Sequence, residues 1–430
     1  MQAGSFPAPG ASLHLDFVGN RGFSAGRTGT AASFLTFTNA SSQYYTDASG
    51  NLALASANSA VFDYSRSSVG TILGLRVQKQ RTNSIRNNTM VGAAAGSPGT
   101  LPTNWNRTGS ITGLTQTIGL PGTINGVNEM TVRLNGTTAA SSITYYTDTT
   151  TGITASAGQV WTASAFLHLA AGSTTNLTAF QIGLVALDSS QVQIGTNSTI
   201  GVLAANLQSS PTRYEVSRTL PANTAYVRLF VAATYTNGAA IDFTMGIGLP
   251  QLEQGQGATS PIATTNAAAT RSGDVVALTD FASIFNQWGG TVVSEWVYGT
   301  DTSTAGVWIV SDGTASNAIR GALYNGAGAN VSDVLVSGSS PGGVSVATQN
   351  TAATTYRHAV EYDRTILAAS GSGAAQDQIL TPSMPASLSA MYLGCGSGNG
   401  AVTNNLDGWL RQLIYFPRAA RPYQLPGLSR

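Results

Sequence analysis

Two acidic residues stand at a spacing that glycoside hydrolysis could use. Glu361 and Asp363 are two positions apart in His358-Ala-Val-Glu-Tyr-Asp, so on a β-strand their side chains share one face. Hydrolysis of a glycosidic bond normally needs two carboxylates, about 5 to 5.5 Å apart in retaining enzymes and about 6.5 to 9.5 Å apart in inverting ones. Such a pair also fits a purely structural role on a strand, and Glu295 beside Trp296 offers a single carboxylate. We therefore predict no catalytic residue and keep glycan degradation as an alternative.

Binding a sugar makes smaller demands on the sequence. Aromatic rings stack on the apolar faces of pyranoses, while amide, carboxylate and guanidinium groups bind the hydroxyls. The candidates are aromatic and amide residues of two β-rich segments: Trp105, Tyr145, Tyr146, Tyr235, Asn237, Trp288, Tyr324 and Asn325. Tyr235 and Asn237 stand in Thr234-Tyr-Thr-Asn-Gly, where Thr and Gly predict an exposed loop tip. By contrast, Trp161 and Trp308 lie inside alternating strands and are predicted to be core residues.

Metal and nucleophile chemistry finds little support in the sequence. The three histidines, His14, His168 and His358, are far apart, and no two have metal-ligand spacing. The run Gly22-Phe-Ser-Ala-Gly matches the nucleophile-elbow pattern but is followed by Arg-Thr-Gly-Thr, which does not predict the helix that this elbow needs. The glycine-dense run from Gly394 contains no phosphate-binding lysine.

Calcium is the one ion that the acidic residues leave open. Asp301, Asp312 and Asp333 could contribute oxygen ligands, although their spacing is not that of an EF-hand loop. We predict no metal site and no cofactor, with calcium binding as an unsupported alternative.

Composition excludes several classes of function. The 430 residues predict two or three domains. Charged residues make up 9% and the net charge is +1, so the basic surface of a nucleic-acid-binding protein is missing. Cys395 is the single cysteine, which excludes an intrachain disulfide framework. No apolar run approaches the roughly 18 residues of a membrane span, and the first ten residues do not look like a secretion signal.

The chain reads as short alternating strands separated by Gly, Ser and Asn turns, which predicts an all-β fold built of antiparallel sandwiches. No long helical period interrupts the pattern. The stretch Gln251 to Val275 is rich in Thr, Ala, Ser and Gly, and Pro261 cannot donate a ladder hydrogen bond. We interpret this stretch as a seam between two β-rich halves.

Several segments resemble those of phage minor structural proteins. Pro250-Gln-Leu-Glu-Gln-Gly, Thr259-Ser-Pro-Ile and Ala269-Thr-Arg resemble a segment that closes a carbohydrate-binding-module-like jelly roll and opens a laminin-G or concanavalin-A-like sandwich. The run Gly99-Thr-Leu-Pro-Thr-Asn-Trp resembles the entry to the second strand of such a jelly roll. Asp407-Gly-Trp-Leu-Arg-Gln-Leu-Ile-Tyr-Phe-Pro-Arg resembles the last strand of laminin-G-like sandwiches, and a short helical tail is then expected at about 422–428.

The N-terminal part carries its own resemblance, to a module of phage tail and adsorption proteins. The matching pieces are Tyr45-Thr-Asp-Ala-Ser-Gly, Phe62-Asp-Tyr and Gln80-Arg-Thr-Asn. Together the resemblances imply an N-terminal β-rich attachment unit at 1–88, a jelly roll at 89–262 and a second sandwich at 263–430.

The resemblances imply a virion structural protein of a phage or gene transfer agent, as a spike, fibre or decoration subunit. Residues 1–88 would contact other virion proteins, and the sandwiches would bind host cell-surface polysaccharide. Such a protein would assemble in the bacterial cytoplasm and act on the particle surface as a homo-oligomer, because weak sugar sites gain avidity from several copies. Two alternatives stay open: a capsule depolymerase, and a purely structural particle protein whose loop aromatics are buried between subunits.

Overall fold

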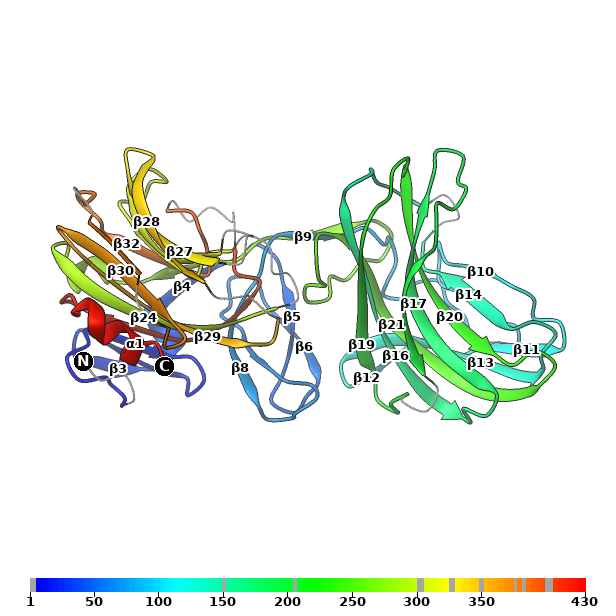
Figure 1. Cartoon of the computed structure of the whole chain (residues 1–430). Coiled ribbons are helices and arrows are strands. Elements are labelled where there is room, and N and C mark those ends of the chain that lie inside the picture. Colours follow the sequence, from blue (N-terminus) through cyan, green and yellow to red (C-terminus); the bar gives the residue numbers. More distant parts are fainter. Residues whose placement is uncertain are drawn as a thin grey trace. The chain divides into compact units, whose positions relative to one another are not determined.

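The computed structural model describes residues 5–148, 152–203, 207–299, 305–324, 329–347, 352–374, 377–380, 384–398 and 405–430. Strands make up nearly all of its regular structure (Figure 1), so the predicted all-β class is confirmed. The single α-helix among these residues, α1 (Leu425–Leu428), has four residues. Within the described ranges, no helix is long and apolar enough to cross a membrane.

The chain forms two compact units, and their boundaries differ from the predicted three modules. Unit 1 consists of 1–50, 54–80 and 272–430, and unit 2 of 51–53 and 81–271. The expected separate unit at 1–88 is therefore wrong. Unit 2 begins and ends on paired strands, since β9 (Arg81–Asn83) pairs with β22 (Ala269–Arg271).

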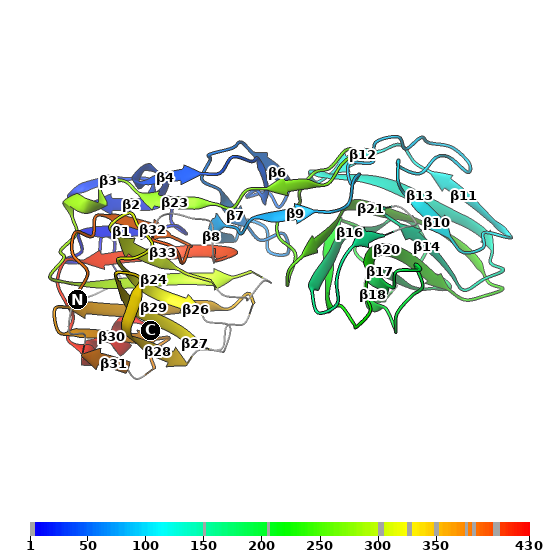
Figure 2. The same cartoon turned by 90° about the horizontal axis from the view of Figure 1, so that it is seen from above.

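Unit 1 is a sandwich of two antiparallel sheets. Sheet A has, in spatial order, β3 (Arg27–Gly29), β2 (Arg21–Ser24), β1 (Leu13–Asp16), β33 (Gly408–Phe416), β24 (Gly289–Tyr298), β29 (Thr355–Asp363), β30 (Ile366–Gly371) and β31 (Asp377–Leu380), and Figure 2 shows this succession. Two further strands join it, as β8 (Ile72–Val77) pairs with β33 and β7 (Phe62–Tyr64) pairs with β8.

Sheet B has β28 (Ser339–Ala347), β27 (Ala329–Val336), β26 (Ala318–Tyr324), β25 (Trp308–Ser311), β32 (Ala390–Leu393), β23 (Val275–Leu278) and β4 (Leu35–Thr38). Outside the two sheets lie the hairpin of β5 (Gln43–Thr46) and β6 (Leu52–Ala55), and the short helices η1 (Ala31–Phe34) and η3 (Phe281–Ser283).

The N-terminal strands belong to unit 1 because they cannot bury their apolar faces alone. Leu13 and Leu15 alternate with polar positions, and both are fully buried where β1 pairs with β33. Strands of three or four residues need the apolar face of a larger sheet to be stable. Their partner lies about 400 positions later in the chain, which is why the sequence pattern suggested a separate module.

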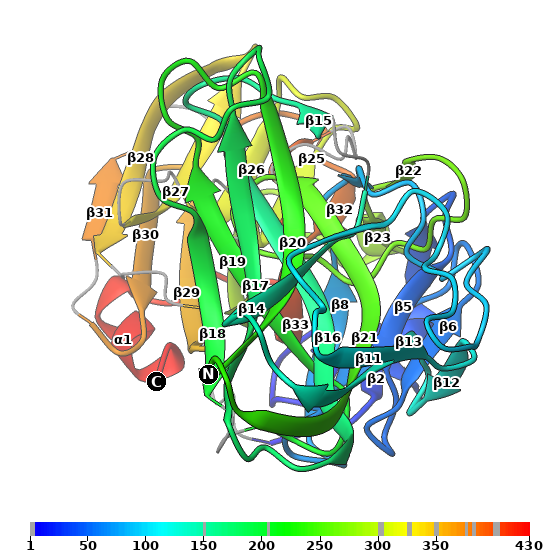
Figure 3. The same ribbon diagram turned by 90° about the vertical axis from the view of Figure 1, so that its right-hand side faces the viewer.

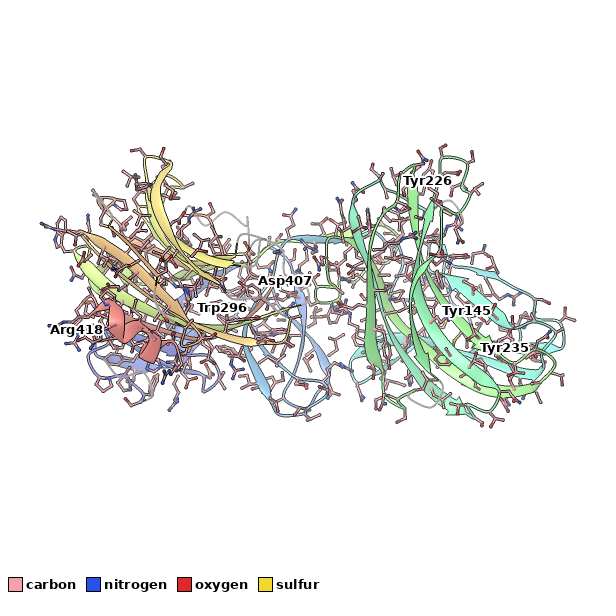
Figure 4. The ribbon with its side chains drawn as sticks, viewed as in Figure 1. Tyr145, Tyr226, Tyr235, Trp296, Asp407 and Arg418 are labelled. Carbon is pink, nitrogen blue, oxygen red and sulfur yellow. The ribbon has the colours of Figure 1, made fainter. Side chains whose placement is uncertain are left out.

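The two chain ends cover the outer face of sheet A. Ala8, Leu425 and Leu428 pack on apolar residues of that face, including Val293 and Phe416. The predicted helical tail at about 422–428 is confirmed as η4 (Pro422–Gln424) followed by α1. The C-terminal segment is also held by hydrogen bonds before the helix. The Thr291 hydroxyl donates to the carbonyl of Arg418, which Figure 4 labels.

Unit 2 is a second sandwich. Sheet C has β11 (Leu114–Ile118), β13 (Val127–Thr137), β21 (Ala240–Gln254), β16 (Val160–Gly172) and β19 (Thr212–Thr219), with β12 (Gly122–Ile124) beside β13. Sheet D has β10 (Asn106–Thr108), β14 (Ser142–Tyr146), β20 (Tyr226–Tyr235), β17 (Leu177–Leu187) and β18 (Ser198–Leu203), with β15 (Ile153–Thr154) beside β20. Figure 3 looks onto sheet D, with β20, β17 and β14 toward the viewer. Alternate residues of both sheets fill one apolar core between them.

The predicted seam at Gln251 to Val275 is wrong at its start, because β21 continues to Gln254. Polar residues on this strand obscured it, since Gln251 and Glu253 are fully buried. The Glu253 carboxylate accepts hydrogen bonds from the backbone N–H and the hydroxyl of Thr259, and the Gln251 side chain accepts one from the Ile262 N–H. Residues 255–262, which we call the strap, thus fold back over the outer face of sheet C. The strap supplies the hydrogen-bond partners of the buried Gln251 and Glu253 side chains.

Candidate functional site

Three of the predicted sugar-binding aromatics of unit 2 are buried in its core. Tyr145 is fully buried and its hydroxyl donates to the Gln116 side chain at 3.0 Å. Trp105 is 8% exposed and its indole N–H donates to the Asn87 carbonyl. Tyr235, expected at an exposed loop tip, is 2% exposed. Figure 4 labels Tyr145 and Tyr235 within this sandwich, and neither ring can stack on a sugar there.

Strand parity accounts for this correction. Tyr145 and Tyr146 are neighbours on β14, so one must face the core and the other the outside. Tyr235 is the last residue of β20, and its parity points it into the core with Val231 and Ala233. Asn237, two positions later, is exposed at the turn into β21 as expected. The core placement of Trp161 is also confirmed, since it is 5% exposed.

Tyr146 does face outward, and it lies on an aromatic surface that covers the centre of sheet D. Val185, Leu187, Phe230 and Ala232 form a buried apolar patch on this outer face, with Tyr146 and Tyr226 packed against it. The Tyr146 and Phe230 rings meet nearly edge to face, with centroids 6.3 Å apart. We call these six residues, together with Arg228, the tyrosine platform.

Half-buried polar residues border the platform. Thr144 and Ser142 lie on the same face of β14 as Tyr146, two and four positions before it. Gln181 on β17 lies across from Ala232. Asn106 of β10 lies beside Tyr146 in the strand register. This arrangement of an aromatic centre with amide and hydroxyl groups at its edge matches what a pyranose ring needs.

Arg228 supplies the positive charge of the platform. Its guanidinium carbon lies 5.0 Å from the centroid of the Tyr146 ring, a cation–π distance. One terminal nitrogen donates to the Gln191 side chain at 3.4 Å, and the buried Nε has no hydrogen-bond partner among the described atoms. Burial lowers the pKa of this guanidinium, while the neighbouring Tyr146 raises it.

The sequence analysis did not select Phe230, Arg228 or Tyr226 of the platform. The available signal was the run Tyr226-Val-Arg-Leu-Phe-Val, in which apolar or aromatic residues occupy both strand parities. A strand with one face in water should alternate instead, so apolar residues at both parities indicate that its outer face is also functional or covered.

Part of the opposite outer face of unit 2 is covered by the chain itself, while Arg133 and Asp242 on the same face are exposed. The strap of residues 255–262 crosses sheet C, and Arg213 bonds both Ser164 of the sheet and the Thr259 carbonyl of the strap. His168 and Glu129 form a buried pair on the same face, below the carbonyl of Ser209. On sheet D, the platform residues that reach solvent are the half-buried Tyr146, Tyr226 and Arg228, whereas its other four residues are buried.

The sugar-binding candidates of unit 1 differ in whether the structure describes them and in how exposed they are. Trp288 is 58% exposed, and the Arg364 guanidinium lies 3.8 Å from its ring centroid. Tyr324 lies in β26, but its side chain is outside the described residues, as is all of Asn325. Trp308 is 1% exposed, which confirms its predicted core position.

The two carboxylates considered for hydrolysis do not form an accessible pair. Glu361 is 1% exposed and faces the side of sheet A on which the C-terminal segment packs. Burial, with a smaller contribution from Asp363, raises the pKa of Glu361 to about 7. Asp363 accepts two backbone N–H bonds in the turn before β30. Glu295 pairs with Arg411 and lies 3.9 Å from Arg357.

The acidic residues considered for calcium are engaged elsewhere or are not described. Asp333 forms two hydrogen bonds with Arg320, and Asp312 accepts bonds from Thr314 and Asn317. Asp301 lies outside the described residues. Within the described part of the chain, no three His, Cys, Asp or Glu residues are grouped as metal ligands.

No protein-family model matches the sequence, and no curated protein matches it. Among solved structures, the chain is similar to the CBM40 module of a Ruminococcus gnavus IT-sialidase bound to α2,6 sialyllactose, at 12% identity over 35% of this chain and 87% of that one, with a TM-score of 0.30. It is similar to domains LG4-5 of the mouse laminin α1 chain, at 12% identity over 66% of this chain and 90% of that one, with a TM-score of 0.27. It is also similar to the enzymatically active domain of tailspike protein 4 of bacteriophage CBA120, at 13% identity over 35% of this chain and 19% of that one, with a TM-score of 0.25.

Proposed function

We propose that the chain is a glycan-binding structural protein of a phage or phage-like particle, and that the tyrosine platform of unit 2 is its principal sugar site. The observation that carries the proposal is the grouping of aromatic rings and a guanidinium on the outer face of sheet D. Tyr146, Tyr226 and Arg228 are half-buried there, beside the buried patch of Val185, Leu187, Phe230 and Ala232. An aromatic surface with polar edges is typical of a binding site.

The particle role rests on the sequence resemblances and on the composition. A surface with few charges, in which Thr and Ser alternate with apolar residues, suits a rigid component that is displayed in many copies. Attachment cannot depend on a separable module at 1–88, because β1 and β8 are strands of sheet A. Contacts with other virion proteins therefore involve the surface of the assembled unit 1, and oligomerisation supplies the avidity that a shallow site needs.

The proposal is tested by binding the purified full chain to host cells and to their extracted capsule and lipopolysaccharide. Tyr146→Ala should weaken binding by up to about tenfold, since a stacked aromatic ring contributes roughly 0.5 to 1.5 kcal/mol beyond its buried area. Tyr423→Ala is the matched control, because Tyr423 is 65% exposed but belongs to the C-terminal segment of unit 1. Binding that is unaffected by Tyr146→Ala would contradict the assignment of the site.

Two further outcomes would overturn the function itself. Shortening of the polysaccharide in the same tube would favour a depolymerase and would direct attention to Glu361 and Asp363. A complete absence of binding would leave a purely structural particle protein. Trp288→Ala adds a separate measurement, because a loss of affinity in that variant would place a second sugar contact in unit 1.

A further inference from the structure

We propose that the ligand of the tyrosine platform is an acidic glycan, whose carboxylate pairs with Arg228. The inference rests on the proposed function and names the class of sugar that the same site selects. The carrying observation is that Arg228 is a half-buried cation without a carboxylate partner among the described residues.

Two other arginines of unit 2 are paired with carboxylates, and a third with carbonyls. Arg86 makes two side-chain hydrogen bonds to Asp148, and Arg133 makes two to Asp242. Arg218 donates to the carbonyls of Leu184 and Ile194. Arg228 has one long bond to the Gln191 amide at 3.4 Å and a Nε that is buried without a partner. A charge withdrawn from water without a counterion is costly, so a ligand that supplies the counterion is favoured.

The position of Arg228 fits this role. It lies on β20 between Tyr226 and Phe230, with its guanidinium over the Tyr146 ring. A sugar ring that contacts Tyr146 or Tyr226 would therefore carry its substituents close to the guanidinium. The planar guanidinium matches a carboxylate with two parallel N–H···O bonds, and the stacked ring keeps it oriented before the ligand arrives.

The experiment compares acidic polysaccharides with their neutral counterparts. The full chain is titrated with polygalacturonate, alginate and hyaluronan, and with each polymer after its carboxylates have been reduced to primary alcohols. We expect tight binding of at least one acidic polymer and about a tenfold or greater loss after carboxyl reduction, since a hydrogen bond to a charged group contributes more than a neutral one. Arg228→Gln should abolish the difference between the acidic and reduced forms, and Arg228→Lys should retain part of it.

The controls separate this inference from the proposed function. Arg133→Gln removes an exposed arginine from the other outer face of unit 2 and should leave the acidic preference unchanged. Equal, Tyr146-dependent binding of the acidic and reduced polymers would overturn the acidic ligand while supporting a glycan site. Equally tight binding of polyphosphate would also overturn it, by showing general attraction of anions. Binding of none of the polymers, acidic or reduced, would overturn the proposed function as well. Thermal unfolding of each variant verifies that the platform is folded.

Discussion

The Nε2 atom of His168 lies 2.8 Å from a carboxylate oxygen of Glu129, and both side chains are buried on the outer face of sheet C. The other ring nitrogen lies 3.0 Å from the carbonyl oxygen of Ser209. Both partners offer acceptor oxygens, so these contacts favour the doubly protonated imidazole, in which both ring nitrogens donate. Gly246 makes room for the ring, since a Cβ at that position would lie 2.0 Å from Nε2.

We predict that Glu129→Gln destabilises unit 2 much more at pH 6 than at pH 9. Burial opposes the charge of His168, but the hydrogen bond and the charge of Glu129 outweigh it, so the pKa of His168 is raised. A base whose folded pKa is raised contributes stability that is complete below pH 6.5 and is lost as pH rises through the folded pKa. Breaking a buried pair costs about 3 to 5 kcal/mol, which urea unfolding at the two pH values would measure.

The exposed pair of Arg133 and Asp242 is the matched control, because it joins β13 to β21 on the same face. Asp242→Asn should cost at most about 1 kcal/mol, as surface ion pairs contribute little. Equal losses for Glu129→Gln at pH 6 and pH 9 would show that the buried histidine is not charged.

Unit 1 should lose stability in acid through His358. This residue is 1% exposed and meets Trp296 edge to face, and its two ring nitrogens have no described partner. Burial lowers the pKa of His358 to about 4, so the folded state holds it neutral. The unfolded chain binds the proton below pH 6.5, and stability therefore falls from pH 6.5 toward pH 4.

His358→Leu should remove part of this acid sensitivity. At pH 5 the wild-type residue costs about 2 kcal/mol, at 1.36 kcal/mol per pKa unit, and the leucine variant does not pay this cost. Calorimetric unfolding at pH 5 and pH 8 measures the difference. His14, whose pKa is also lowered to about 4 by burial, is unchanged in both proteins and serves as the internal reference. The same pH dependence in wild type and variant would contradict the prediction.

Glu361 should lower the stability of unit 1 in mild alkali, whereas His358 lowers it in acid. Its pKa is raised to about 7, chiefly by burial, so the folded state favours the neutral acid. Its stabilising contribution is complete at low pH and falls as pH rises from 4.5 to about 7. Glu361→Gln should therefore stabilise unit 1 at pH 9 by up to about 3 kcal/mol and change little at pH 4. Unchanged stability at pH 9 would show that the carboxylate finds a counterion there.

Several features of this fold could be predicted from local pattern. The all-β class follows from alternation and turn residues, and the tail at 422–428 was predicted within a residue or two. The core positions of Trp161 and Trp308 followed from their places inside predicted strands. Each of these inferences depends on residues that are close in the sequence.

Inferences that depend on distant partners were less successful. Packing against the opposite sheet decides whether Tyr145 or Tyr146 faces the core. The alternation in the sequence fits either tyrosine at the core position equally well. Gln251 and Glu253 were interpreted as loop residues, because the strap that satisfies them was not visible in the pattern. Arg228 was overlooked because the sequence does not show which side chains surround it. Only the fold reveals that no described carboxylate pairs with it.

The boundaries of the two units lead to the last prediction, which concerns fragments of the chain. Residues 81–271 contain both sheets of unit 2 and should fold alone, with cooperative unfolding and the affinity of the full chain for glycans. Residues 272–430 lack β1, β8 and β4, so sheet A would expose β33 and sheet B would lose an edge strand. Such an open apolar edge favours aggregation. Co-expression of 1–80 with 272–430 should restore a soluble unit 1, as judged by gel filtration and circular dichroism. If 272–430 folds and stays monomeric alone while 1–88 is separately folded, the three-module division would be correct and the two-unit description would fail.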